Sequence, residues 1–319
     1  DVCHVALLPP GFYRIIHVAI QNGKVNFANR LISGPPLLLD GAMGTELERR
    51  GVNVSLPLWS AAAVEDHPEI VQAIHSDHVS AGAMVITTAT FRTLPRTFAK
   101  TADDLREATD RARTAALTAV NLAKKAAGSE VLVAGSIAPL EDCYTPELFP
   151  GVEKGVAEFR QLAEWLIEGG VDLFLIEAMS RIDEASAALE ATDDLGLPRW
   201  VSYMVSDAEH LLSGARLESA VREVEKGGAE AVLINCSDPF VSVVALDTMR
   251  LCTDLPLGLY PNLGHSDPEP SGEFSDIYSR KEFIQTMTRA IQRGARIVGG
   301  CCGSSPGHIA ALAKNISGL

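Results

Sequence analysis

The sequence lacks three features that would each have indicated a class of protein. It has no apolar run of 18 or more residues, which excludes a transmembrane helix. Its 27 basic residues are outnumbered by 41 acidic ones, whereas a nucleic-acid-binding protein normally has the opposite balance. Six cysteines in 319 residues are too few for a disulfide scaffold. We therefore expect neither a nucleic acid nor a membrane as a partner.

The first 33 residues lack the basic start, the long apolar core and the small-residue cleavage site of a signal peptide. We therefore predict a cytoplasmic protein whose thiols stay reduced. Residues 1–33 are assigned to an N-terminal extension of unknown role, and residues 34–319 to a single domain.

The domain has ample material for a packed core, because 47% of the chain is hydrophobic and 21% is charged. Short apolar runs, many of them β-branched, alternate with longer segments of helical period. The runs are 37–40, 84–88, 131–136, 173–178, 199–205, 231–236, 256–262 and 295–301. Eight such runs, each followed by a helix, predict an α/β fold, the (β/α)8 or TIM barrel, with an open doubly wound sheet as the main competitor.

Polar residues gather where these runs end. They are Asp40, Thr87, Thr88, Ser136, Glu177, Cys236, Asn262, Cys301 and Cys302. In a barrel the carboxyl ends of all strands converge on one face, where the following loops build the active site. The run of residues 263–276, rich in Gly, Pro and Ser, is predicted to be a long loop on that face.

The strongest local signal is the GGCCG sequence at 299–303, at the end of the last run. Taken alone, the cysteine pair is as consistent with two buried apolar side chains as with a metal site. Cys236 ends the sixth run and should lie near it, so three thiolates could form three corners of a tetrahedral zinc site. The fourth corner stays open, which is typical of a catalytic zinc.

The charge of such a site indicates a reaction. Three thiolates and Zn²⁺ sum to −1, so the metal is a poor Lewis acid for carbonyl groups. It can still hold an incoming thiol as a thiolate at neutral pH, because coordination removes the proton. The natural partner for this sulfur nucleophile is an alkyl group on a cationic donor.

With these residues the chain resembles the homocysteine S-methyltransferases, zinc-dependent (β/α)8 barrels that include betaine-using and S-methylmethionine-using branches. The resemblance covers roughly residues 36–318. Its motifs are LLLDGAMGTELERRG (37–51), LW (58–59), HPEIVQAIH (67–75), GSIAP (135–139), IEAM (176–179), INCS (234–237), YPNLG (260–264) and GGCCGSSPGHIAAL (299–312). It implies methyl transfer to homocysteine, giving methionine, with Cys236, Cys301 and Cys302 binding zinc.

The resemblance also implies roles for other residues. Asp40 and Gly41 match the segment that contacts homocysteine, and Glu177 matches the acid that pairs with its amino group. Asn235 stands beside a zinc cysteine and could orient it. Trp59 matches a tryptophan of the methyl-donor pocket in the betaine-using branch, where an indole face attracts onium groups.

Two departures weaken any transfer of the donor's identity. Ala178 follows the fourth-strand glutamate, where the family often has threonine or an aromatic residue. Phe91 stands where the betaine-using branch has a tyrosine hydroxyl. The donor is therefore left as S-methylmethionine, S-adenosylmethionine or a betaine.

Structural alternatives accompany these roles. Asp40 could simply cap the following helix, and Trp59 could be ordinary packing. His75 and His78, three apart on a predicted helix, could form a metal pair, but we expect that helix to face solvent.

Functional alternatives also stay open. One is methylation of selenocysteine or another thiol. The others are a thiol redox protein using Cys301 and Cys302, and a barrel that serves a separate corrinoid protein. A homo-oligomer is one option for the assembly.

Overall fold

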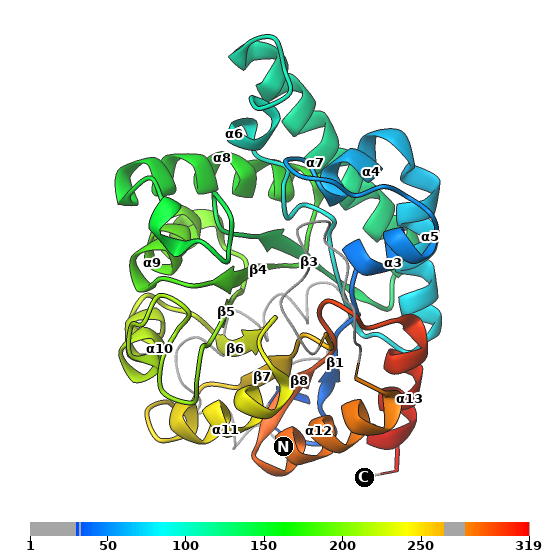
Figure 1. Ribbon diagram of the computed structural model, residues 1–319, viewed down its shortest axis with the longest axis vertical. Coiled ribbons are helices and arrows are strands. Elements are labelled where there is room, and N and C mark those ends of the chain that lie inside the picture. The colour runs from blue at the N-terminus through cyan, green and yellow to red at the C-terminus, as the bar shows by residue number, and fades with distance from the viewer. Residues whose placement is uncertain (1–29, 32, 265–277, 319) are drawn as a thin grey trace.

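Eight short strands lie at the centre of the molecule and helices surround them (Figure 1). The structure is a computed structural model that describes residues 30, 31, 33–264 and 278–318. The strands are β1 (Leu37–Leu38), β2 (Val85–Thr87), β3 (Leu132–Ile137), β4 (Leu173–Met179), β5 (Arg199–Tyr203), β6 (Ala231–Asn235), β7 (Leu257–Tyr260) and β8 (Ala295–Val298). Each lies within, or within one residue of, one of the eight apolar runs.

All neighbouring strands are parallel, in the order β1-β8-β7-β6-β5-β4-β3-β2. The two ends of this order meet through a parallel bridge between Leu39 and Val85, where the Asp40 N–H donates to the Val85 carbonyl oxygen at 3.0 Å. The sheet therefore closes on itself. This confirms the single-domain (β/α)8 barrel over the open sheet.

Helices occupy the connections between strands and form the outer layer in Figure 1. They are α3 (Gly44–Arg49), α4 (Ser60–Asp66), α5 (Pro68–Ser80), α6 (Pro95–Phe98), α7 (Leu105–Ala127), α8 (Val152–Gly169), α9 (Ile182–Thr192), α10 (Leu217–Lys226), α11 (Pro239–Arg250), α12 (Arg280–Gln292) and α13 (Pro306–Ile316). Capping residues determine where several of these helices begin. Asp104 caps α7 by accepting from the Glu107 N–H, and the Ser279–Glu282 capping box begins α12.

Alternation along the strands divides the core into two layers. Leu37 and Leu39 belong to an apolar cluster inside the barrel, whereas Leu38 belongs to the larger cluster between strands and helices. Trp200 and Tyr260 fill the interior with large side chains. The barrel is thus a packed core rather than a pore.

Two predicted segments lie mostly outside the described residues. Of the extension assigned to 1–33, Arg30, Leu31 and Ser33 are described, and Leu31 packs into the apolar cluster inside the barrel. Of the predicted loop 263–276, Leu263 and Gly264 are described. The division of the chain at residue 34 stays a prediction. In the part of the chain that the structure covers, every helix is too short or too polar to span a membrane.

Candidate functional site

A cavity of about 480 Å³ opens where the strands end, a size typical of sites for small molecules. We call it the site cavity. The eight residues predicted to bind metal or substrate all line it. They are Asp40, Gly41, Trp59, Glu177, Asn235, Cys236, Cys301 and Cys302. The barrel therefore gathers into one place residues that lie up to 262 positions apart in the sequence.

Three cysteines form a cluster on one side of the cavity. Cys236 directly follows β6, and Cys301 and Cys302 lie in the loop after β8. Their sulfur atoms all lie within 4.8 Å of one another, and the Sγ atoms of Cys236 and Cys302 are 3.7 Å apart. Cys236 and Cys301 are joined by a disulfide. The prediction that the thiols stay reduced is therefore wrong for this pair, which shares one cysteine, Cys301, with the redox alternative.

The cluster fits zinc once that disulfide is reduced. Four ligands at the usual Zn–S distance of about 2.3 Å are separated by about 3.8 Å along each edge of a tetrahedron. The separation between Cys236 and Cys302 is close to this value. Three soft thiolates leave one of four corners for a ligand from the cavity.

Backbone strain is concentrated around the cavity. Within the described part of the chain, three residues other than glycine have positive φ: Trp59 (48°), Ala178 (57°) and Cys236 (47°). Each such residue costs of order 1–3 kcal/mol, and strained positions of this kind cluster at functional sites. All three line the site cavity. Ala178 lies within β4, at the register shift between Ile176 and Met179, whereas Cys236 directly follows β6 and Trp59 directly precedes α4.

Asp40 is a buried carboxylate that follows β1. Its two oxygens accept hydrogen bonds from the N–H of Thr87 at 2.7 Å and from the Thr87 hydroxyl at 3.1 Å. Burial raises the pKa of Asp40 to about 8. The nearby helix α3 has Met43 at its N-cap and no side-chain cap, so the capping alternative for Asp40 is wrong.

Glu177, in β4, is the second buried carboxylate. The hydroxyl of Ser136 donates to its Oε1 at 2.5 Å, and the hydroxyl of Tyr260 donates to its Oε2 at 3.2 Å. Burial raises the pKa of Glu177 to about 6. Neither Glu177 nor Asp40 forms an ion pair with a described residue. Two buried acids without a cation form a site that favours a ligand's ammonium group.

Asn235 connects three strands beneath the cavity. Its Oδ1 accepts from the Ala178 N–H at 3.0 Å and from the Ser202 hydroxyl at 2.8 Å. Its Nδ2 is buried without a hydrogen-bond partner. Asn235 therefore holds the backbone next to Glu177 in place and keeps both N–H groups of its amide unused.

Trp59 and Phe91 form an aromatic wall of the cavity. Their ring centroids are 5.7 Å apart in an edge-to-face arrangement. The indole lies directly against α3, because a Cβ on Gly44 would be 2.2 Å from the Trp59 Cζ2 atom. Gly41 is similarly constrained, since a Cβ there would be 2.7 Å from the imidazole of His78.

Sequence reasoning missed the residues that support the acids. Thr87 and Ser136 were singled out only as polar residues ending apolar runs, without a role, and Tyr260 was part of the YPN motif. No signal in the sequence distinguished Arg92, which also lines the cavity, from the other basic residues.

The expectation that the helix carrying His75 and His78 faces solvent at these positions is wrong. Both imidazoles are buried beneath α5, which packs against α7 and α13. Both ring nitrogens of His75 lack a hydrogen-bond partner. Burial lowers the pKa of His75 to about 3 and that of His78 to about 4.

Comparisons with known proteins agree with this geometry. A family model described as Homocysteine S-methyltransferase matches residues 37–316. The chain is 34% identical to Homocysteine S-methyltransferase of Escherichia coli (strain K12), covering 86% of this chain and 94% of the relative. It is 27% identical to Selenocysteine Se-methyltransferase of Brassica oleracea var. italica, covering 89% of this chain and 90% of that protein.

A solved structure is also similar. The metallated form of the homocysteine methyltransferase MmuM from Escherichia coli superposes with a TM-score of 0.77 at 30% identity, covering 89% of this chain and 98% of that one. The oxidised form of MmuM superposes with the same TM-score at 32% identity, covering 89% and 97%.

Proposed function

Because the chain belongs to the homocysteine S-methyltransferase family and is a methyltransferase, we propose that it methylates the thiol of homocysteine, giving methionine, at a zinc ion held by Cys236, Cys301 and Cys302. One observation carries this proposal. The sulfur atoms of three cysteines lie within 4.8 Å of one another at the edge of a cavity that also contains two buried acids, neither of which forms an ion pair with a described residue. Homocysteine has the two groups that this pair of subsites would bind, a thiol and an ammonium group.

The contacts in the site cavity indicate a separate role for the metal and for the two acids. Zinc, when bound, would hold the incoming thiol as a thiolate. Asp40 and Glu177 bind the ammonium group, and the hydroxyls of Thr87, Ser136 and Tyr260 hold these carboxylates in position. The barrel thereby orients the substrate sulfur, which removes much of the entropic part of the barrier.

The methyl donor is a small onium compound. As the sulfur bonds to the methyl carbon, the bond between that carbon and the onium atom breaks, and its electron pair leaves with the neutral donor. Trp59 and Phe91 present rings suited to a cationic group at this wall. S-methylmethionine, S-adenosylmethionine and a betaine all meet this description.

Selenocysteine is the second candidate acceptor. It is favoured by the similarity to a relative named Selenocysteine Se-methyltransferase. It has the same ammonium and carboxylate groups, with a selenol in place of the thiol. Direct competition between homocysteine and selenocysteine for one donor would rank the two.

The test is zinc content followed by a donor screen. Protein purified under reducing conditions should contain about one zinc per chain, and Cys302→Ser should lose it. Cys252→Ser is the matched control, because that thiol donates to backbone oxygens of α11 and does not line the cavity. The wild type should then convert homocysteine to methionine with at least one onium donor.

The other outcomes are equally clear. Reduced protein that cannot be loaded with zinc would refute the proposal and favour thiol redox chemistry. Zinc without turnover on any small donor would favour a barrel that serves a separate corrinoid protein.

A further inference from the structure

Arg92 is an unusual residue in the site cavity. Among the described residues that line the cavity it is the one cation, and the lining also includes the acids Asp40 and Glu177. Its side chain is nine-tenths buried, and its Nε has no hydrogen-bond partner. One nitrogen, Nη1, donates to the backbone oxygen of Glu141 at 3.0 Å. A guanidinium carries its charge at every accessible pH, so burying it with so few partners is costly.

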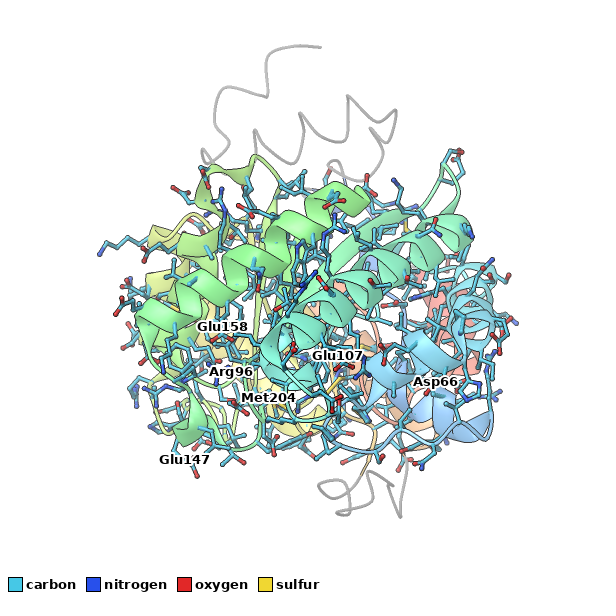
Figure 2. All side chains as sticks on the ribbon, turned by 90° about the horizontal axis from the view of Figure 1, so that it is seen from above. Asp66, Arg96, Glu107, Glu147, Glu158 and Met204 are labelled. Atoms are coloured by element: carbon cyan, nitrogen blue, oxygen red, sulfur yellow. A yellow bond between two sulfur atoms is a disulfide. The ribbon has the colours of Figure 1, made fainter. Side chains whose placement is uncertain are left out.

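Glu141 and Glu158, near Arg92 in the fold, are already paired with other cations. Arg96, four residues further on, lies beside Glu158 (Figure 2) and donates to it at 2.9 and 2.5 Å. The carboxylate of Glu141 accepts from Arg96 at 3.1 Å and from Lys100 at 2.8 Å. Among the described ion pairs, none involves Arg92. Its free donors are therefore available to an anion that enters the cavity.

The position of Arg92 indicates which substrate brings that anion. Its guanidinium carbon is 5.6 Å from the centroid of Phe91, whose ring meets Trp59 edge to face. Arg92 thus belongs to the aromatic wall assigned above to the donor. The acceptor's ammonium subsite is formed by other residues, Asp40 and Glu177.

Building on the proposed function, we propose that Arg92 binds the carboxylate of the methyl donor. The donor is then a zwitterion, an onium ion that carries its own carboxylate, with its cationic end at Trp59 and Phe91 and its acid at Arg92. A bare sulfonium or ammonium ion would leave Arg92 without an anion and should be a poor substrate.

The test compares S-methylmethionine with its carboxamide, which keeps the sulfonium and removes the negative charge. Wild-type protein should prefer the acid by about 10- to 100-fold in kcat/KM and in calorimetric affinity, the usual value of a hydrogen bond to a charged group. Arg92→Gln keeps a donor for the Glu141 oxygen and should make the two compounds nearly equivalent. Arg92→Lys should keep part of the preference. Arg113→Gln, at an exposed arginine of α7 paired with Glu168, should behave as wild type.

Each alternative result has a distinct meaning. A wild type that accepts acid and carboxamide equally overturns the assignment, whatever the folding of the variants. So does an Arg92→Gln variant that loses activity equally on both compounds, because Arg92 would then only support the fold. If Arg92→Gln raises the KM for homocysteine and leaves the donor KM unchanged, Arg92 binds the carboxylate of the acceptor, and the assignment to the donor is overturned. If the wild type binds the acid selectively without turnover, the inference stands and the proposed methyl transfer fails.

Discussion

Two opposing effects act on the protonation of the two buried acids, Asp40 and Glu177, in the site cavity. Their burial favours the protonated form, with pKa values of about 8 for Asp40 and about 6 for Glu177. Binding an ammonium group favours the ionised form. The free site therefore holds protons that a ligand must displace, and its affinity should depend on pH.

We predict that metal-free protein binds methionine more tightly as pH rises from about 6 to about 8. Methionine has the ammonium group of homocysteine without a free thiol, so the ligand's sulfur does not titrate. Calorimetry across this range checks the prediction. Asp40→Asn keeps acceptor and donor atoms for Thr87, and it should lower the affinity about 10-fold or more at pH 8 and flatten the upper part of the profile. An affinity that does not change with pH would contradict the role of these acids.

The buried histidines show what residue-level reasoning could not reach. The spacing of His75 and His78 predicts a shared helix face, and the structure confirms that both lie on α5. Whether that face meets solvent depends on α7 and α13, which are distant in sequence. Because histidine is polar, the sequence favoured exposure of both side chains to solvent. Packing of α5 against the other helices buries both imidazole rings instead.

A stability prediction follows for His75. Its pKa falls from the ordinary 6.5 to about 3 in the folded state, so between these values the unfolded chain binds the extra proton. Folding stability is therefore lost as pH falls below 6.5, by about 1.4 kcal/mol per pH unit for one proton. His75→Leu removes this loss, and its advantage in urea unfolding should grow from pH 7 to pH 5. His67→Leu, at an exposed position, should show no such trend. If the gain in the free energy of unfolding of His75→Leu over wild type does not change with pH, the buried neutral His75 is not the cause of the loss of stability.

At the scale of elements, strands were more predictable than the contacts of loops. Parallel strands buried on both faces appear as continuous apolar runs, which is why all eight could be located. The loop that carries Cys301 and Cys302 is different, because it is held by helix α3, which follows β1, the strand next to β8. Arg49 of α3 donates to the backbone oxygens of Gly303 at 2.6 Å and Ser304 at 2.7 Å. No periodicity in the sequence indicates such a pairing.

This contact predicts that α3 controls metal affinity. Arg49→Met frees the cysteine loop from α3 while leaving all three thiols, so zinc affinity should fall by about 10- to 100-fold, the range seen when groups that orient metal ligands are lost. Competition with a chromophoric chelator measures it. Arg50→Met is the matched control, since the neighbouring Arg50 pairs with Asp77 and Glu46 and does not bond to the loop. Equal zinc affinities in the two variants would show that Arg49 has no such role.

At the scale of the whole molecule, the alternation of strands and helices was compatible with both a barrel and an open sheet. Closure depends on the meeting of β1 and β2 through Leu39 and Val85, which hydrophobic period alone does not specify. The polar residues at strand ends favoured closure, because only a barrel brings the ends of the sixth and eighth strands and the first strand to one place. The disulfide between Cys236 and Cys301 was not foreseen, because the distance between their sulfur atoms depends on the order β8-β7-β6 in the sheet and on the backbone turn at Cys236, where φ is 47°.

Zinc should therefore act on the stability of the entire barrel. It would join the loop after β6 to the loop after β8 and bind only the folded chain, so the free energy of unfolding should rise by about 2.7 kcal/mol at 100 times the dissociation constant. For a domain of this size that corresponds to a rise in Tm of roughly 4 to 5 °C. The rise should require a reductant, because Cys236 and Cys301 are otherwise joined. Calorimetric scans of wild type and Cys302→Ser, each with and without zinc and with and without reductant, separate the effects. An equal rise in Cys302→Ser would mean that zinc stabilises the protein from another site, and the three-thiolate centre would then be wrong.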